Sequence, residues 1–321
     1  KGRPFRLPVV KNGPRIALVV LISGAVTTSL WLIVSGGVSF FNLDFTEVYE
    51  YRDVVAEAIN VGVMGYVNNW SWKVFGPALL TLALWRKNYF FALLVFLLHV
   101  FWFGVSSNVS VLFTPLLPVF AWWFLRRTSA LTWIPLAVGG IVLLFTLFSL
   151  SLDSHYPAHL IPRRTHFVPA RLTFDYYYYF GENGYVWWSS SSVTLGFVEY
   201  PYDLNPAELI GAWRYKGSHA NNSFLATGYM HAGIAGIVIY GILAGLFFRL
   251  MDSVSVRGIP SWVLVAVMFK PCHSLIAGAD LPTALLTKGL AIGIILLFLM
   301  RRSCGSFDSA YDERKDCRTK D

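Results

Sequence analysis

Long apolar runs alternate with short charged breaks along most of the chain. A helix needs about 20 residues to cross the hydrocarbon core of a bilayer, and eight of the runs approach or exceed that length. They cover residues 16–37, 61–85, 89–105, 111–125, 132–150, 226–248, 261–278 and 283–300. The pattern therefore predicts an all-α polytopic membrane protein with at least eight transmembrane helices and one large external loop that carries short helices.

The composition agrees with this fold class. Of the 321 residues, 55% are hydrophobic and 14% are charged, and the mean hydropathy is +0.54, which ordinary soluble domains do not reach. The cysteines at positions 272, 304 and 317 have no pairing or metal-ligand spacing, so neither a disulfide framework nor a structural zinc is expected, and no cofactor is predicted. The chain begins with Lys1 rather than Met, which predicts further sequence upstream and makes eight helices a lower limit.

Basic residues fall in every second break between the predicted helices, which orients the chain because Lys and Arg collect in cytoplasmic loops. These residues are Lys1, Arg3, Arg6, Lys11, Arg15, Arg86, Lys87, Arg126, Arg127, Arg249, Arg257, Arg301 and Arg302. The predicted organisation is a cytoplasmic segment 1–15, helices one to five in 16–150, an external loop 151–225, helices six to eight in 226–300 and a cytoplasmic tail 301–321. The net charge of +8 is thus a topology signal, and no nucleic-acid partner is expected.

The external loop 151–225 is rich in aromatic residues, unlike a flexible linker. Tyr176, Tyr178, Trp187 and Trp188 have two interpretations. They form an interfacial belt, with one end of each ring apolar and the other wet, or they form a carbohydrate-binding surface.

Arginines at both ends of this loop also have two interpretations. Arg163, Arg164 and Arg171 bind lipid headgroups or pair with nearby acids, or they recognise a phosphate or pyrophosphate, for which a planar guanidinium supplies parallel donors. A second basic pair, Arg214 and Lys216, lies in "WRYKGSHANNSF" just before helix six. The two basic groups could clamp one anion between them.

Helix six contains a series of glycines that predicts close packing against a neighbouring helix. They are Gly228, Gly233, Gly236, Gly241 and Gly245. His231 in the same helix is either a packing histidine or a base.

Several stretches resemble one family. The run "ANNSFLATGYMHAGIAGIVIYGILAGLFFRLMD" is similar to the signature helix of the O-antigen polymerases, the Wzy-type oligosaccharide repeat-unit polymerases of bacterial envelopes. "RRTHFVPARLTFDYYYYF" with "YVWWSSSS" resembles the external segment of that family, "FGVSSNVSVLFTPLLPVFAWWFLRR" its short outer turn and returning helix, and "TALLTKGLAIGIILLFL" its final helix. One departure is that many members have a lysine near the outer turn, where this chain has "SNVS".

The resemblance implies a membrane glycosyltransferase. Members polymerise undecaprenyl-pyrophosphate-linked oligosaccharide repeat units into a surface polysaccharide, such as the O-antigen of lipopolysaccharide, a capsule or an exopolysaccharide. They act at the periplasmic, external face of the bacterial inner (cytoplasmic) membrane. The implied partners are the lipid-linked oligosaccharide, the lipid bilayer, and a chain-length regulator and flippase of the same pathway.

The chemistry of this reaction assigns roles to the candidate residues. An acceptor hydroxyl attacks the anomeric carbon and the pyrophosphate leaves, so its negative charge must be stabilised, and no metal is required. The catalytic candidates are Arg163, Arg164, His219 and His231. The substrate-binding candidates are Arg171, Arg214, Lys216, Asn221, Asn222, Tyr176, Tyr178, Trp187 and Trp188. His166, Glu199 and Asp203 are further candidates for assisting the hydroxyl.

Other functions remain open at this stage. A lipid-linked oligosaccharide ligase of similar architecture would differ only in its acceptor. A transporter or flippase would use Lys73, Lys270 and Lys288, which fall inside predicted spans where charge is costly. We see no internal repeat of the kind common in transporters, and the polar chemistry is concentrated in one loop, which favours the enzyme.

Overall fold

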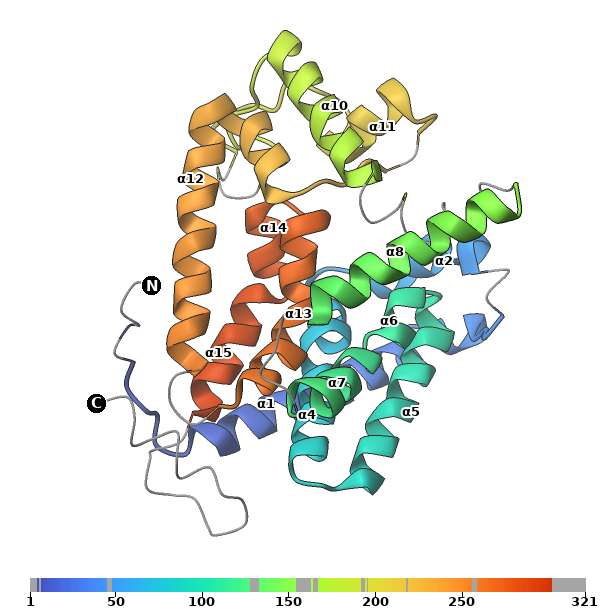
Figure 1. Cartoon of the computed structure of the whole chain (residues 1–321), viewed down its shortest axis with the longest axis vertical. Coiled ribbons are helices and arrows are strands. Elements are labelled where there is room, and N and C mark those ends of the chain that lie inside the picture. Colours follow the sequence, from blue (N-terminus) through green and yellow to red (C-terminus); the bar gives the residue numbers. More distant parts are fainter. Residues whose placement is uncertain are drawn as a thin grey trace. The chain divides into compact units, whose positions relative to one another are not determined.

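The computed structural model describes residues 5, 7–44, 48–127, 133–153, 163, 167–191, 194, 196–217, 219–255 and 259–301. Throughout these residues the regular secondary structure is helical (Figure 1). The chain forms two compact units. The first contains residues 1–123, 246–270 and 289–321, and the second contains residues 124–245 and 271–288.

The first unit is built mainly from the N-terminal helices. They are α1 (Gly13–Val34), the 3₁₀ helix η1 (Gly37–Phe40), α2 (Val48–Ile59), α3 (Val63–Trp70), the π-helix η2 (Ser71–Phe75), α4 (Gly76–Trp85), α5 (Tyr89–Ser106), α6 (Val109–Phe113) and α7 (Leu116–Phe120), with α15 (Leu290–Met300) from the C-terminal part. The π-helix η3 (Ala121–Leu125) lies where the first unit ends.

The second unit holds the long segment between the predicted fifth and sixth spans. Its helices are α8 (Trp133–Ser151), α10 (Val168–Asn183), α11 (Pro206–Arg214) and α14 (Leu281–Leu286). Two helices, α12 (Phe224–Ser255) and α13 (Ser261–Ala277), run from one unit into the other.

Among the described residues, three helices are long and apolar enough to cross a membrane, namely α1, α5 and α12. The 22 residues of α1 extend for about 33 Å, close to the thickness of a hydrocarbon core. Shorter apolar helices occur at residues 109–125, 138–151, 261–277 and 290–300. The chain is therefore a helical protein whose apolar helices suit a membrane.

Some predicted spans are divided. The run 111–125 consists of α6, α7 and η3, because Pro115 and Pro118 lack the N–H that a continuous helix requires. The run 283–300 is interrupted at Gly289, which has φ +87°, so that α14 and α15 are separate helices. The run 61–85 is helical nearly throughout, but it passes through the π-helix η2.

Helix α1 buries mostly small residues along with two leucines, and it exposes large apolar residues. Its buried stripe consists of Gly13, Ala17, Leu21, Ala25, Thr28 and Leu32. The opposite side exposes Ile16, Val19, Ile22, Val26, Leu30 and Ile33. A water-soluble helix has the reverse arrangement, whereas small residues at helix interfaces and large residues toward lipid are typical of membrane helices.

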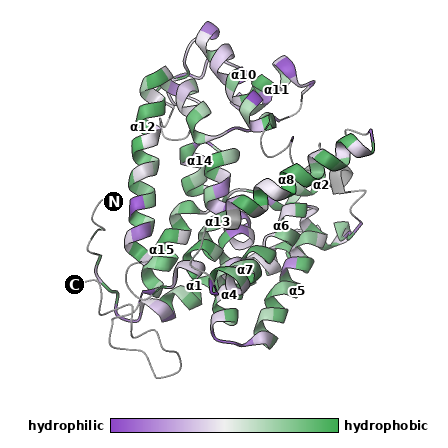
Figure 2. Cartoon of the chain, in the orientation of Figure 1, coloured by the Kyte–Doolittle hydropathy of each residue, from purple (hydrophilic) through white to green (hydrophobic). Residues whose placement is uncertain are grey.

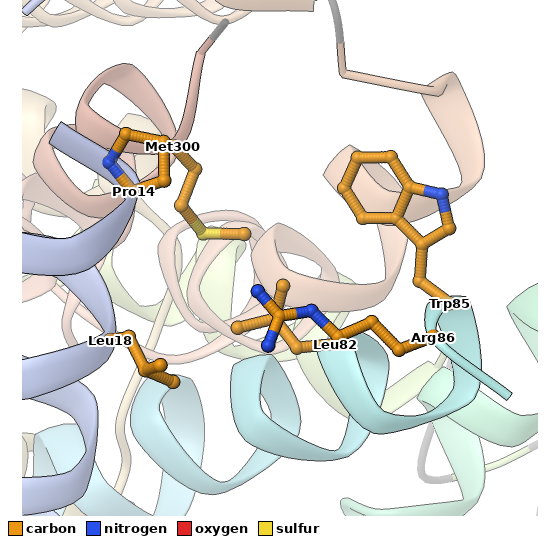
Figure 3. A pocket seen from close by; sticks show the side chains of 6 residues that line it. All are labelled: Pro14, Leu18, Leu82, Trp85, Arg86 and Met300. Atoms are coloured by element: carbon orange, nitrogen blue, oxygen red, sulfur yellow. The ribbon is translucent and has the colours of Figure 1, made fainter. Parts of the chain in front are cut away.

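Two groups of contacts join the ends of helices in the first unit. In one group, the guanidinium of Arg301 donates to the carbonyls of Leu7 and Pro8 at 3.1 and 3.2 Å. In the other, the N–H of Asn42 donates to the carbonyl of Gly104 at 2.9 Å. The first group includes a small cavity of about 20 Å³ (Figure 3). Its lining residues are Pro14, Leu18, Leu82, Trp85, Arg86 and Met300.

In the second unit, α10 and α11 lie side by side (Figure 1) over an apolar core. The core consists of Leu172, Tyr176, Phe180, Val186, Ile210, Ala220, Ala226 and Met230. Each helix begins with a proline in its first turn, where the missing N–H costs nothing. Asn205 caps α11 by accepting the N–H of Glu208 at 3.1 Å. This core fixes the positions of the polar side chains described next.

Candidate functional site

A buried carboxylate joins α10 to α11. Asp175 is only 2% exposed, and its two oxygens accept hydrogen bonds from the guanidinium of Arg214 and from the hydroxyl of Tyr215. A charge this deeply buried requires such partners. The side chain of Arg214 is 49% exposed, so its remaining donors can reach a ligand.

A second arginine lies against the same tyrosine. The Arg171 guanidinium is 5.4 Å from the centre of the Tyr215 ring, within the range of a cation–π interaction. Burial, followed by the hydrogen bond and charge of Asp175, raises the pKa of the Tyr215 phenol, while Arg171 and Arg214 act in the opposite direction. The phenol therefore stays protonated at neutral pH and can donate to Asp175.

Exposed aromatic rings border this cluster. The rings of Tyr178 and Trp213 stack nearly parallel, with centroids 6.0 Å apart and an interplanar angle of 10°. Their residues are 54% and 40% exposed. The Arg214 guanidinium lies 4.9 Å from the centre of the Trp213 ring, and a hydrogen bond with Glu182 raises the pKa of the Tyr178 hydroxyl. The arrangement places exposed aromatic surface beside a cation.

Residues before α12 form a buried polar patch next to α10. The Asn222 carbonyl oxygen accepts the N–H of Ser223 at 2.7 Å and the hydroxyl of Thr173 at 3.4 Å. Its amide nitrogen is buried and has no hydrogen-bond partner among the described residues. Tyr176 donates its hydroxyl to the carbonyl of Ala220 at 3.0 Å.

Helix α12 is broken near its start. Ala232 and Gly233 have non-helical torsion angles, with φ +62° and ψ −140° at Gly233, a conformation that glycine adopts with little strain. The break folds the first part of α12 against the second. A Cβ atom added at Gly236 would lie 1.9 Å from the carbonyl oxygen of Gly228.

The loop after α10 completes the end of this first part. The N–H groups of Val186 and Trp187 donate to the carbonyls of Met230 and His231, both at 3.0 Å. These carbonyls have no partner within the helix because they belong to its last turn. Trp187 and Trp188 both adopt positive φ, +49° and +61°, and this backbone aims the Trp188 N–H at the ring of His231.

Four side chains form a hydrogen-bonded network at the break. His231 is fully buried, and its Nδ1 accepts the N–H of Trp188 at 3.2 Å. The ring proton therefore resides on Nε2, which donates to Oδ2 of Asp280 at 3.2 Å. The indole of Trp188 stacks on the imidazole at 5.2 Å and donates its Nε1–H to the Tyr240 hydroxyl at 2.9 Å.

Asp280 is the only member of this network with a carboxylate. Besides His231, it accepts the N–H of Leu281 at 2.9 Å and so caps α14, and it hydrogen-bonds with the hydroxyl of Tyr240. Its side chain is 16% exposed. The sequence interpretation missed this residue, although it is the one acid between Asp252 and Asp308 in the sequence.

The structure brings some predicted site residues together and separates others. Arg171, Arg214 and Tyr178 lie in or beside the Asp175 cluster, whereas Trp188 and His231 belong to the Asp280 network. His219 has a side chain that is 64% exposed and lies 3.9 Å from Glu208. Further predicted residues are exposed: Arg163, Lys216, Asn221 and Trp187, together with the alternatives Glu199 and Asp203. Arg164 and His166 lie outside the described residues.

Three of the expectations need correction. Tyr176 is 1% exposed and belongs to the apolar core, so its ring has no free face for a sugar. Gly228 and Gly236 pack against each other within α12, because the chain turns at Gly233. Gly241 and Gly245 have open space where a Cβ would lie, so they do not make the predicted helix contact.

Comparison with protein-family models, curated proteins and solved structures found no match to this chain. Within the described residues, no group of three His, Cys, Asp or Glu side chains could hold a metal ion.

Proposed function

We propose that the chain is a membrane glycosyltransferase that polymerises undecaprenyl-pyrophosphate-linked oligosaccharide repeat units into a surface polysaccharide. The observation that carries this proposal is the grouping of two arginines beside exposed aromatic rings. Arg171 lies against Tyr215, and Arg214 binds the Asp175 carboxylate that Tyr215 also binds. The exposed rings are those of Tyr178 and Trp213. Guanidinium groups suit a pyrophosphate. Exposed aromatic faces suit the sugar attached to it.

The proposed roles follow from the reaction. Arg171 and Arg214 stabilise the negative charge that develops on the leaving pyrophosphate. Arg163 and Arg164, just before α10 in the sequence, are proposed to add to the same charge. We propose further that the neighbouring polar and aromatic side chains bind the sugars of donor and acceptor. These side chains are Lys216, His219, Asn221, Trp187 and Trp188, whereas Asn222 is only 2% exposed and cannot contact a sugar.

We also propose that the chain crosses the inner membrane eight times, with both ends cytoplasmic and the residue 151–225 segment outside. Contacts among helix ends support this topology. In the first unit, the N-terminal segment meets residue 301, and the region after α1 meets the end of α5. In the second unit, residues 186–188 meet Asp280 through His231. In each case, the two segments in contact are ones that the positions of the basic residues assign to the same side of the membrane.

A ligase or a transporter would require other features. No side chain of this site distinguishes a ligase from a polymerase, because the two reactions share a donor, so the product must distinguish them. For a transporter, Lys73 would have to line a path, but its ammonium donates to Asn69 Oδ1 at 2.5 Å within one stretch of helix. The polymerase remains the better-supported proposal.

The test is chain elongation by the full chain in lipid vesicles supplied with undecaprenyl-pyrophosphate-linked repeat units. Longer lipid-linked products, seen as a ladder on a gel, are expected from the wild type. Arg171→Ala should lower the elongation rate by about 100-fold, because Arg171 is exposed and free to contact the leaving group. Arg15→Ala, which removes an exposed arginine at the start of α1, is the matched control.

Three results would count against the proposal. Transfer of the repeat unit only to a different acceptor would identify a ligase. Movement of the lipid-linked unit across the bilayer without elongation would identify a flippase. Equal rates for Arg171→Ala and the control would remove the leaving-group role.

A further inference from the structure

The Asp280 network, formed by Trp188, His231, Tyr240 and Asp280, shares no residue with the Asp175 cluster. Its imidazole and carboxylate are groups that can transfer protons. It joins three segments that are distant in sequence, around residues 188, 231–240 and 280. Trp187 and Trp188 beside it adopt positive φ, which is uncommon for residues other than glycine. Such conformations cost free energy and cluster at functional sites.

His231 is unable to touch a substrate in this arrangement. Its side chain has no exposed surface, and the Trp188 indole covers one face of the ring. Both ring nitrogens are already engaged, Nδ1 by the Trp188 N–H and Nε2 by Asp280. The imidazole can therefore orient a neighbour but cannot take a proton from an incoming hydroxyl.

Asp280 has the properties that His231 lacks. Its side chain retains 16% exposure. A carboxylate offers about four lone-pair positions, and three are used by His231, Tyr240 and the Leu281 N–H. One acceptor position is left for a further donor, and the three bonds fix the carboxylate in one orientation.

No member of the Asp280 network lies on α10, the helix that carries Asp175 and Arg171. Asp175, which holds Arg214, directly precedes Tyr176 in α10. The Asp280 charge is among the causes that raise the pKa of the Tyr176 phenol, after burial and the neighbouring Tyr200. The charge of Asp280 therefore acts on the Tyr176 phenol.

We propose that Asp280 is the proton acceptor for the attacking sugar hydroxyl, and that His231 and Tyr240 are positioning residues that hold its carboxylate. This inference rests on the proposed glycosyl transfer. A bond forms between the acceptor oxygen and the anomeric carbon, and the bond from that carbon to the pyrophosphate oxygen breaks. Its electron pair leaves with the pyrophosphate, and the hydroxyl proton moves to Asp280, which later releases it to water.

The decisive variant is Asp280→Asn in the full chain, assayed by elongation in vesicles. Asn caps a helix as well as Asp does, so α14 should persist, whereas the amide cannot accept the proton. We expect kcat to fall by about 1000-fold with KM for the lipid-linked donor nearly unchanged. Asp153→Asn, an exposed acid at the end of α8, is the matched control and should retain wild-type kcat.

The positioning role of His231 has a separate readout. His231→Ala removes a hydrogen-bond donor that orients the Asp280 carboxylate, so kcat should fall by about 10-fold while KM for the lipid-linked donor stays nearly unchanged. His231→Gln, which can place an N–H near the same position, should restore kcat. Equal losses of kcat in the two variants would show a structural effect alone and would contradict the positioning role.

The outcomes separate the two proposals. A wild-type chain that does not elongate the substrate overturns both. An active wild type together with Asp280→Asn at no less than a tenth of its kcat overturns only the assignment of Asp280. If Asp280→Asn fails to fold, Asp280→Ser keeps a helix-capping oxygen without a carboxylate, and wild-type kcat in that variant overturns the assignment equally.

Discussion

Helix α8 is mostly hydrophobic along its length, whereas α10 mixes hydrophobic and hydrophilic residues (Figure 2). On α8, the described apolar side chains are largely exposed around the helix, Leu136, Ile141, Leu144 and Leu147 among them. On α10, apolar residues on one side enter a core, while Arg171 and Glu182 are exposed. A helix that is apolar all round requires an apolar solvent, whereas a one-sided helix suits water. The difference indicates that α8 suits an apolar environment and that α10 suits water.

The same contrast separates α1 from the α10–α11 pair. Helix α1 buries three small residues and a threonine together with Leu21 and Leu32, and it buries no aromatic ring. The α10–α11 core instead contains large side chains such as Tyr176 and Phe180, whose burial stabilises a fold in water by about 2 kcal/mol each. In a bilayer that gain is absent between helices, and close backbone packing replaces it.

The largest expected effect tests whether close backbone packing shapes α12. Gly236→Ala would force its methyl group onto the Gly228 carbonyl, so we expect a loss of more than about 3 kcal/mol and little folded protein. Gly241→Ala in the same helix meets open space and should be neutral. Thermal unfolding in detergent measures both variants. Equal stability of the two would show that the break at Gly233 is not needed.

A second pair of variants tests whether α8 faces lipid and whether α10 faces water. Leu147 on α8 and Phe174 on α10 are 55% and 73% exposed. Lysine at a lipid-facing position near the middle of a span costs about 3 kcal/mol, so Leu147→Lys should reduce membrane insertion and yield. Phe174→Lys should express normally because the position faces water. Normal insertion of Leu147→Lys, measured by membrane fractionation, would contradict the lipid-facing assignment of α8.

The smallest expected effect concerns Asp175, the buried charge beside the α10–α11 core. Arg214→Ala leaves the buried Asp175 carboxylate with only Tyr215 as a side-chain hydrogen-bond partner. We expect a loss of about 2 kcal/mol, less than for a fully buried pair because Arg214 is half exposed. Lys216→Ala, at an exposed neighbouring position, should change stability by less than about 0.5 kcal/mol. Thermal unfolding compares the two, and equal midpoints would show that the ion pair adds nothing.

Much of the helical architecture could be read from hydropathy, because a long apolar run has few alternatives to a helix. The runs that became α1, α5 and α8 were predicted within a few residues. Pro115 and Pro118 lie in the run 111–125, which the structure divides into α6, α7 and η3. The average hydropathy of the run does not reveal such a break. The basic breaks were equally visible, since charge is a property of the residue itself.

The candidate site was less predictable. The sequence indicated that Arg171 and Arg214 belong to one segment, but it did not indicate that Arg171 would lie against Tyr215 or that Arg214 would bind Asp175. It suggested Tyr176 as a sugar ligand, although the structure uses that ring in the core. Side-chain chemistry alone does not distinguish a tyrosine that binds a ligand from one that fills a core.

The sequence by itself determined where apolar helices form, which breaks are basic and which segment concentrates arginine and aromatic rings. These properties depend on residues that are close together in the sequence, so they can be predicted without knowledge of the fold. The tertiary structure alone decided that Asp175 holds Arg214, that α12 turns at Gly233 and that Asp280 meets His231, 49 residues away in the sequence. Those partners are chosen by packing and by the need to satisfy buried polar groups, which act between segments that the chain brings together only when it folds.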